Sequence, residues 1–300
     1  MFSIFKKRLP PARAPRQRRV TELEIVTARL IRAGFAGDYH SAFHGRGIEF
    51  SQVREYQPGD DIRSIDWNVT ARTGVPHVKE FIEERDLTIL VAIDVSGSMT
   101  FGSVDWRKID IAAELASIFA FSAVQNSDRV GLLLFSRNAR RFIPPRRGRG
   151  HAQVLVRAAV DAAIDGCSGA ADLANAVTFL DRVAVKRSVV IVISDFLDLD
   201  FDRPLRRLNR RHDVVAITVT DPRERRFPDR GLVRLVDDET GEARLLDLRR
   251  SGVARRAAQR DRELERRFVA AAVDHMEVST AIPYDRELLR FFRERVKRRR

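Results

Sequence analysis

The stretch that decides the fold is Leu87-Thr88-Ile89-Leu90-Val91-Ala92-Ile93-Asp94-Val95-Ser96-Gly97-Ser98. Its first seven residues are nearly all apolar, which is typical of a strand covered on both faces in a parallel sheet. A carboxylate and two hydroxyls follow this run directly. Because ligands of open α/β sheets collect beyond the carboxyl ends of the strands, we expect Asp94 to lie at a binding edge.

A second apolar run, Ser188 to Ser194, also ends in an acid, Asp195. Mg²⁺ prefers oxygen ligands and usually takes only one or two carboxylates from a protein. Two acids at the ends of two central strands are therefore well suited to share one ion. The candidate metal ligands are Asp94, Ser96, Ser98 and Asp195.

The same residues have a simpler interpretation as turn and helix-capping residues. Asp and Ser are common after strands, and Ser98 or Thr100 would serve as the N-cap of a following helix. For either acid alone, capping is the better interpretation. The complete spacing together with the second acid favours the ion site.

From Leu87 onward, apolar strand patterns alternate with helical ones, which predicts an α/β fold with a mainly parallel sheet and helices on both faces. A hairpin over residues 233–248, a helix, a strand over 276–281 and a terminal helix from Asp285 complete this part. We expect strands near 87–93, 129–135, 188–194 and 213–219, and helices near 106–125, 151–164, 172–183 and 201–210.

The part before Leu87 is expected to form two further segments. Residues 1–19 are basic, proline-containing and free of acids, which predicts a disordered arm. Residues 20–85 begin with a helix carrying Leu23, Val26 and Leu30, and residues 86–300 form the large domain. Alternation over residues 65–70 predicts a half-buried strand. The many Arg and Asp residues here form either an internal brace, which we favour slightly, or a recognition surface.

Four stretches together carry a family resemblance: Gly45 to Phe50, Arg54 to Arg63, Ile65 to Asn68 and Ala71-Arg72. With the loop at Asp94, they closely resemble the bacterial domain-of-unknown-function family 58, and the resemblance spans residues 40–300. It implies a von Willebrand factor A-like fold. It also implies a non-enzymatic partner of a MoxR-type AAA+ ATPase, acting in chaperone-like assembly or activation of other proteins.

Asp94-x-Ser96-x-Ser98 with Asp195 resembles the metal-ion-dependent adhesion site of von Willebrand factor A domains, which implies a bound Mg²⁺. The chain departs from that pattern at one position. Ala171, in Gly169-Ala170-Ala171-Asp172-Leu173, stands where the family has a metal-binding Thr. Ala offers no oxygen, so a water, Ser168 or Asp172 would have to fill the position, or the site is weak.

Several classes of function are disfavoured by the sequence. The chain has no Gly-x-x-x-x-Gly-Lys-Ser/Thr motif, so no nucleotide is expected to bind. A metal-dependent hydrolase, activating a water on the same carboxylates, lacks an evident general base. Cys167 is alone, which excludes an intrachain disulfide and fits a reducing compartment. Without an apolar run of membrane-spanning length or a signal sequence, we expect a cytoplasmic protein.

The net charge of +13 attracts polyanions. An alternative function is therefore a basic scaffold on nucleic acid or an anionic membrane. Because no aromatic residues interleave with the basic clusters, a solvated arginine-rich surface is favoured over a nucleic-acid site. The clusters are the N-terminal arm, the expected loop 137–149, residues 206–211 and 223–226, and the last four residues.

Overall fold

The computed structural model describes residues 16–30, 34–43, 48–83, 87–165, 169–198, 200–225, 232–236, 243–247 and 253–298. Contacts divide the chain into two units, a main unit of residues 1–43 and 88–300 and an insert unit of residues 44–87. The predicted segment of residues 20–85 is divided between these two units, because its first two helices belong to the main unit.

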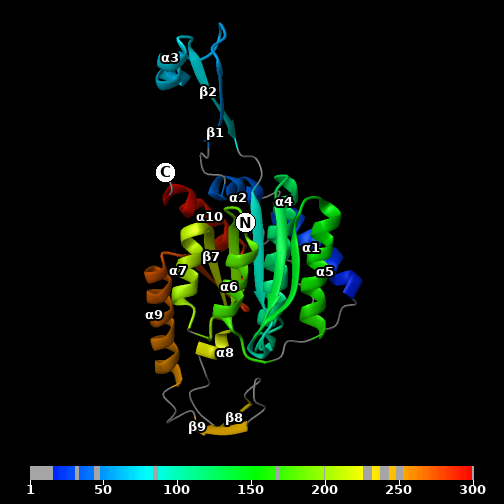
Figure 1. Ribbon diagram of the computed structural model, residues 1–300. Coiled ribbons are helices and arrows are strands. Elements are labelled where there is room, and N and C mark those ends of the chain that lie inside the picture. The colour runs from blue at the N-terminus through cyan, green and yellow to red at the C-terminus, as the bar shows by residue number, and fades with distance from the viewer. Residues whose placement is uncertain are drawn as a thin grey trace. The chain divides into compact units, whose positions relative to one another are not determined.

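The centre of the main unit is a six-stranded sheet with the order β10-β7-β6-β3-β4-β5 (Figure 1). All neighbouring pairs are parallel except β4 and β5, which confirms the predicted α/β fold. The predicted central strands are confirmed within a residue or two. The strands are β3 (Thr88–Asp94), β4 (Arg129–Phe135), β5 (Ala139–Arg146), β6 (Val189–Ser194), β7 (Asp213–Thr220) and β10 (Asp274–Ser279).

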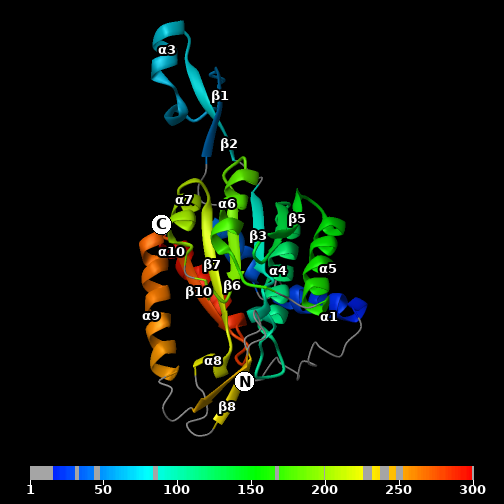
Figure 2. The same cartoon turned by 60° about the horizontal axis from the view of Figure 1, so that its bottom comes forward.

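Helices cover both faces of this sheet (Figure 2). One layer contains α6 (Leu173–Val183), α7 (Asp202–Arg211) and α9 (Val253–Ala271), whose Leu180, Leu208 and Phe268 pack into one core cluster with sheet residues such as Val192. The opposite layer contains α1 (Arg16–Leu30), α2 (Ala36–Phe43), α4 (Lys108–Gln125), α5 (Arg149–Asp165) and α10 (Asp285–Arg298). Rings of α2, α4 and α10 meet there, with Phe119 and Phe292 centroids 6.0 Å apart.

A buried arginine ties α10 to the sheet. Arg295 is 1% exposed and forms ion pairs with Asp213 and with Asp274, the latter at 3.0 Å. Its guanidinium also lies 4.7 Å from the ring centroid of Phe43 on α2. A charge this deep is stable only because its two carboxylate partners replace the water that it loses.

The predicted loop over residues 137–149 is wrong, because most of it forms the edge strand β5. This strand pairs antiparallel with β4, and Ile143 lies opposite Leu132. Pro144 and Pro145 hid the strand in the sequence. Proline lacks a ladder donor and is tolerated at a sheet edge, where one side of the strand needs no partner.

The insert unit is an antiparallel pair, β1 (Ile48–Glu55) and β2 (His77–Glu83), joined through η3 (Ile62–Ser64) and α3 (Trp67–Thr73). The strand predicted over residues 65–70 is wrong. The Asp66 side chain accepts hydrogen bonds from the backbone N–H groups of Asn68 (3.0 Å) and Val69 (3.4 Å), and this N-cap starts a helix. Arg54 and Asp60 form a two-bond ion pair at 2.7 and 2.8 Å, as an internal brace would require.

The remaining elements agree with the sequence where the structure describes them. The predicted hairpin is β8 (Leu232–Val236) paired with β9 (Ala243–Asp247). The helix α1 begins at Arg16, inside the stretch expected to be an arm, and residues 1–15, Cys167 and the last two residues lie outside the described part. Among the described residues, no helix is long and apolar enough to cross a membrane.

Candidate functional site

The candidate site lies at the carboxyl ends of the central strands, in an area that we call the rim: residues 94–107, 169–172, 194–198 and 221–224. Strands β3 and β6 pair in parallel with Ile93 opposite Ile193. Asp94 ends the first strand, and Asp195 follows the last residue of the second. The fold therefore brings the two predicted acids to neighbouring positions on one edge.

Asp94 is fully buried and held by its surroundings. One carboxylate oxygen, Oδ1, accepts from the backbone N–H of Ser96 at 2.8 Å, and Oδ2 accepts from the Ser194 hydroxyl at 2.6 Å. Burial, together with the negative charge of Asp195, raises the pKa of Asp94 to about 7, although these hydrogen bonds act in the opposite direction. Burial and the neighbouring carboxylate thus disfavour the ionised form of Asp94.

The two serines of the loop lie together, with their hydroxyl oxygens 3.1 Å apart. The loop that carries Ala171 also lies at this site, because the backbone N–H of Gly97 donates to the carbonyl of Gly169 at 2.9 Å. Ala171 offers no oxygen here, as expected. The Asp172 carboxylate accepts from the N–H of Asn175 at 2.8 Å as the N-cap of α6, so it is already engaged elsewhere. Ser168 lies outside the described residues.

The residues present fit a hard cation of the Mg²⁺ type. The donors would be hydroxyl and carboxylate oxygens, which are the ligands that this ion prefers. Only two carboxylates contribute, and no group of three or more His, Cys, Asp or Glu suited to a metal occurs within the described ranges. One or two carboxylates suffice for Mg²⁺ because it retains several waters.

Sequence reasoning missed a buried ammonium beside these acids. Lys108, in the first turn of α4, is 0% exposed, and its Nζ lies 2.6 Å from Asp195 Oδ2 and 2.5 Å from Glu224 Oε1. Burial alone would lower the pKa of Lys108, but these two carboxylates raise it, so the ammonium form is kept. The available signal was a lysine opening the otherwise apolar helix sequence after Trp106.

A third buried acid, Asp221, joins the rim loops to one another. Asp221 follows β7 and accepts from the N–H of Ser103 at 2.8 Å and from the Thr280 hydroxyl at 2.7 Å. The Ser103 hydroxyl and the N–H of Arg223 donate to its other oxygen. Although burial raises the pKa of Asp221, these bonds lower it overall, so the carboxylate stays ionised. We call this arrangement the Asp221 clamp.

Apolar side chains are exposed in the same loops that carry the acids. Phe101 and Val104 follow the Asp94 loop and are 38% and 44% exposed, and Leu197 follows Asp195 and is 43% exposed. They add apolar area to the rim, but single exposed apolar side chains also occur elsewhere, such as Val185 at 87% and Val269 at 75%.

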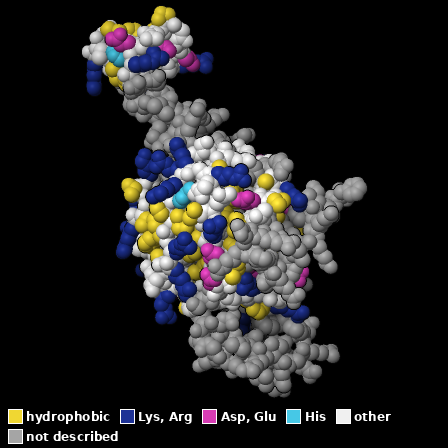
Figure 3. Space-filling view, turned by 90° about the vertical axis from the view of Figure 1, so that its right-hand side faces the viewer, with side chains coloured by type: hydrophobic (Ala, Val, Ile, Leu, Met, Phe, Trp, Pro, Cys, Tyr) yellow, Lys and Arg dark blue, Asp and Glu magenta, His cyan; other side chains and the backbone are white. Residues whose placement is uncertain are grey.

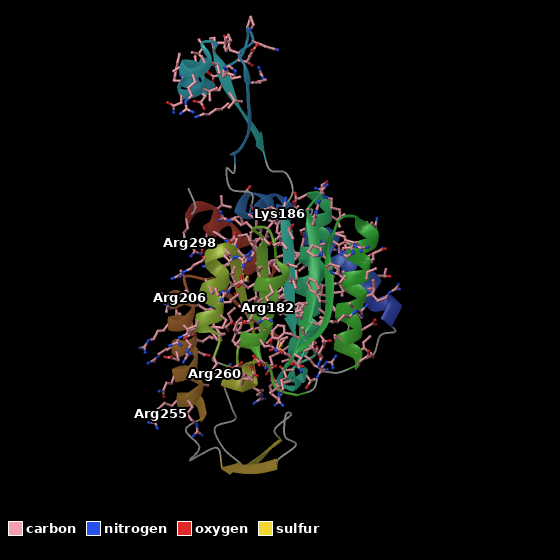
Figure 4. All side chains as sticks on the ribbon, viewed as in Figure 1. Arg182, Lys186, Arg206, Arg255, Arg260 and Arg298 are labelled. Carbon is pink, nitrogen blue, oxygen red and sulfur yellow. The ribbon has the colours of Figure 1, made fainter. Side chains whose placement is uncertain are left out.

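Basic side chains gather on the layer formed by α6, α7 and α9. Figure 4 labels Arg182 on α6, Arg206 on α7, Arg255 and Arg260 on α9, Lys186 after the end of α6, and Arg298 on α10. On the face drawn in Figure 3, basic side chains are instead scattered among hydrophobic ones, and acidic ones are fewer. Arg182, Arg206 and Arg255 are exposed, and we call the part of this layer that carries them the basic surface.

The family model for DUF58, a protein family of unknown function, matches residues 52–267. The chain belongs to the DUF58 family. Its relatives include the uncharacterized proteins Mb1516 of Mycobacterium bovis and Rv1480 of Mycobacterium tuberculosis. Each is 34% identical over 279 residues, which cover 91% of this chain and 87% of the relative. The resemblance stated from the sequence is therefore confirmed.

Among solved structures, the chain is similar to BatB from Bacteroides thetaiotaomicron, at 14% identity and a TM-score of 0.45, covering 70% of this chain and 99% of that one. It is also similar to the SpRpn10 VWA domain, at 13% identity and a TM-score of 0.41, covering 68% and 93%. The main unit has the von Willebrand factor A-like arrangement: a mostly parallel six-stranded sheet between helical layers, with the Asp94 loop at its carboxyl edge.

Proposed function

We propose that this DUF58 protein is a non-enzymatic module that docks a partner protein at the rim. The observation that carries the proposal is the convergence of Asp94, Ser96 and Ser98 from one loop with Asp195 from the neighbouring strand. In the proposed complex these residues would hold Mg²⁺, directly or through the waters that the ion retains, and the ion would bind a carboxylate of the partner. Phe101, Val104 and Leu197 contribute apolar contact around it.

The partner that the family resemblance implies is a MoxR-type AAA+ ATPase. Its nucleotide chemistry would complement a chain that carries no phosphate-binding loop. The complex would then act in chaperone-like assembly or activation of other proteins. This assignment rests on the resemblance, and the geometry of the rim supports only the docking step.

The test is binding of the purified full chain to a purified MoxR-type ATPase from the same organism, measured by isothermal titration calorimetry. We expect binding in Mg²⁺, loss of binding with a chelator, and loss with Asp94→Ala. Asp172→Asn is the matched control, because it changes an acid on the adjoining loop that caps α6. Binding that ignores both the chelator and Asp94→Ala would refute the metal bridge, and no binding under any condition would refute this partner.

A second candidate function is binding of a polyanion, either nucleic acid or an anionic membrane, by the basic surface over α6, α7 and α9. The gathering of Arg182, Arg206 and Arg255 on one layer favours it (Figure 4). Retention on heparin should then fall steeply with salt and with the double substitution Arg206→Glu and Arg255→Glu. Unchanged elution of that variant would exclude this surface.

A metal-dependent hydrolase is the weaker alternative. A carboxyl with a pKa of about 7 would suit a general base, but Asp94 is 0% exposed and both its oxygens accept hydrogen bonds. No substrate proton is therefore within its reach in this arrangement. Turnover in a phosphatase and nuclease screen with Mg²⁺ or Mn²⁺, abolished by Asp94→Ala, would overturn the non-enzymatic assignment.

A further inference from the structure

Lys108 is a buried cation that shares a ligand with the proposed metal site. Its Nζ donates to Asp195 Oδ2 at 2.6 Å, and the other oxygen of Asp195 accepts from the backbone N–H of Leu197 at 3.2 Å. Both oxygens of Asp195 are therefore already engaged. A cation that draws on Oδ2 must share that oxygen with the ammonium, and the repulsion between the two positive charges weakens the bond from Lys108.

Lys108 has a second carboxylate partner, Glu224, with which its ammonium can stay paired. Glu224 accepts from Nζ at 2.5 Å through Oε1, while its Oε2 accepts from the backbone N–H of Asp221 at 3.0 Å. The Glu224 side chain is 23% exposed, whereas that of Asp195 is only 2% exposed. The ammonium thus bridges a buried rim acid and a more exposed acid that is fixed to the Asp221 clamp.

Lys108 neutralises part of the negative charge of the rim. The negative charge of Asp195 acts on Asp94, and Lys108 donates to both Asp195 and Glu224. Removing one member of a buried ion pair leaves an uncompensated charge, which is strongly destabilising. With Lys108 in place, the rim holds together without any metal.

We infer that Lys108 is the built-in counter-ion of the rim, and that a divalent cation reaches Asp195 only by competing with its ammonium, which stays paired with Glu224. This inference rests on the proposed metal-dependent docking and adds its regulation. The affinity of the rim for Mg²⁺ is then set by how strongly Lys108 holds Asp195. Docking would respond to the Mg²⁺ concentration because the wild-type site binds the ion weakly.

Two substitutions should change Mg²⁺ affinity in opposite directions. Lys108→Met removes the competitor with a side chain of similar shape, so Mg²⁺ should bind about tenfold tighter or more. In Glu224→Gln the ammonium of Lys108 has Asp195 as its one remaining carboxylate partner and holds it more strongly. The substitution also removes a nearby negative charge, so Mg²⁺ binding should weaken by about threefold or more. Lys186→Met, on an exposed lysine, is the matched control and should leave affinity unchanged.

The experiment is calorimetric titration of the full chain with MgCl₂, repeated with MnCl₂, together with thermal unfolding in chelator and in excess Mg²⁺. We expect Lys108→Met to unfold earlier than wild type in chelator and to recover more with Mg²⁺ than wild type does. If Lys108→Met fails to fold, Lys108→Gln, which keeps a hydrogen-bond donor without the positive charge, takes its place with the same expected tighter binding.

Equal affinity in wild type, Lys108→Met and Glu224→Gln would overturn the competition while leaving metal-dependent docking intact. If Mg²⁺ and Mn²⁺ bind none of the variants, the competition and the metal bridge are both refuted, and only metal-free docking remains. Tighter binding by Lys108→Met with weaker binding by Glu224→Gln supports the inference.

Discussion

Replacing Asp94 with Asn should make the metal-free protein more stable while removing its response to Mg²⁺. The carboxyl is 0% exposed, and its pKa is raised from 3.8 to about 7 by burial and by Asp195. A rise of about three units, at 1.36 kcal/mol each, corresponds to a destabilisation of about 4 kcal/mol when the group is ionised. A less favourable contact of the Asn amide with Ser194 would offset about 1–2 kcal/mol of the gain.

The sign of the pH dependence follows from the raised pKa. The folded state holds the proton more tightly than the unfolded state, so the destabilisation is absent below pH 3.8 and is complete above pH 7. Relative to wild type, Asp94→Asn should therefore gain about 2–3 kcal/mol at pH 8 and less than about 1 kcal/mol at pH 5.

The assay is urea unfolding in chelator, followed by circular dichroism from pH 5 to pH 8 and repeated in excess Mg²⁺. Ligand binding stabilises a folded state, so Mg²⁺ should raise the midpoint of wild type and not that of Asp94→Asn. Asp172→Asn is the control, because Asn is an equally good N-cap and no pH-dependent gain is expected. An Asp94→Asn variant that is less stable than wild type at pH 8 in chelator, or a difference independent of pH, would refute this reasoning.

Three further predictions concern residues outside the proposed ligands. Arg295→Met should lower the free energy of unfolding by about 3–5 kcal/mol because the largely buried carboxylate of Asp213 would lose its ion pair with Arg295; a loss below about 1 kcal/mol by urea unfolding would count against this ion pair. Burial lowers the pKa of His275 to about 4, so the folded state resists its protonation and stability should fall as the pH drops from 6.5 toward 4, by about 2 kcal/mol at pH 5. His275→Gln should remove that part of the pH dependence, and an unchanged pH profile would contradict it. Finally, Asp221→Ala should speed amide hydrogen exchange at Ser103 by about tenfold or more, since its N–H loses a buried acceptor; equal exchange rates in the variant and wild type would show that the clamp does not hold the loop.

The central sheet could be predicted from the sequence because its signals are local. The apolar runs that form β3 and β6 are covered on both faces, and each leads directly into the acid that follows it. The neighbouring positions of Asp94 and Asp195 follow from parallel pairing alone. The gathering of the candidate ligands thus required no knowledge of side-chain packing.

The errors arose where one residue or one distant contact decides the structure. The alternation of Ile65, Trp67 and Val69 indicated a strand, but the side chain of Asp66 caps the next backbone N–H groups and starts α3. Pro144 and Pro145 indicated a loop where β5 forms, because proline is tolerated in a strand only at the edge of a sheet.

Lys108 could not have been placed by spacing, because its partners lie 87 and 116 residues further along the chain. Its role depends on the packing of α4 against the ends of β6 and β7. No local pattern reports such a contact.

The Asp221 clamp affects the rate at which a partner can bind. Because Ser103 and Thr280 are tied to one buried carboxylate, the loop that presents Phe101 and Val104 has its shape before any encounter. Little conformational entropy is then lost on association, and the surface can engage as a rigid body. Turnover of successive partners would be governed by how quickly each one leaves.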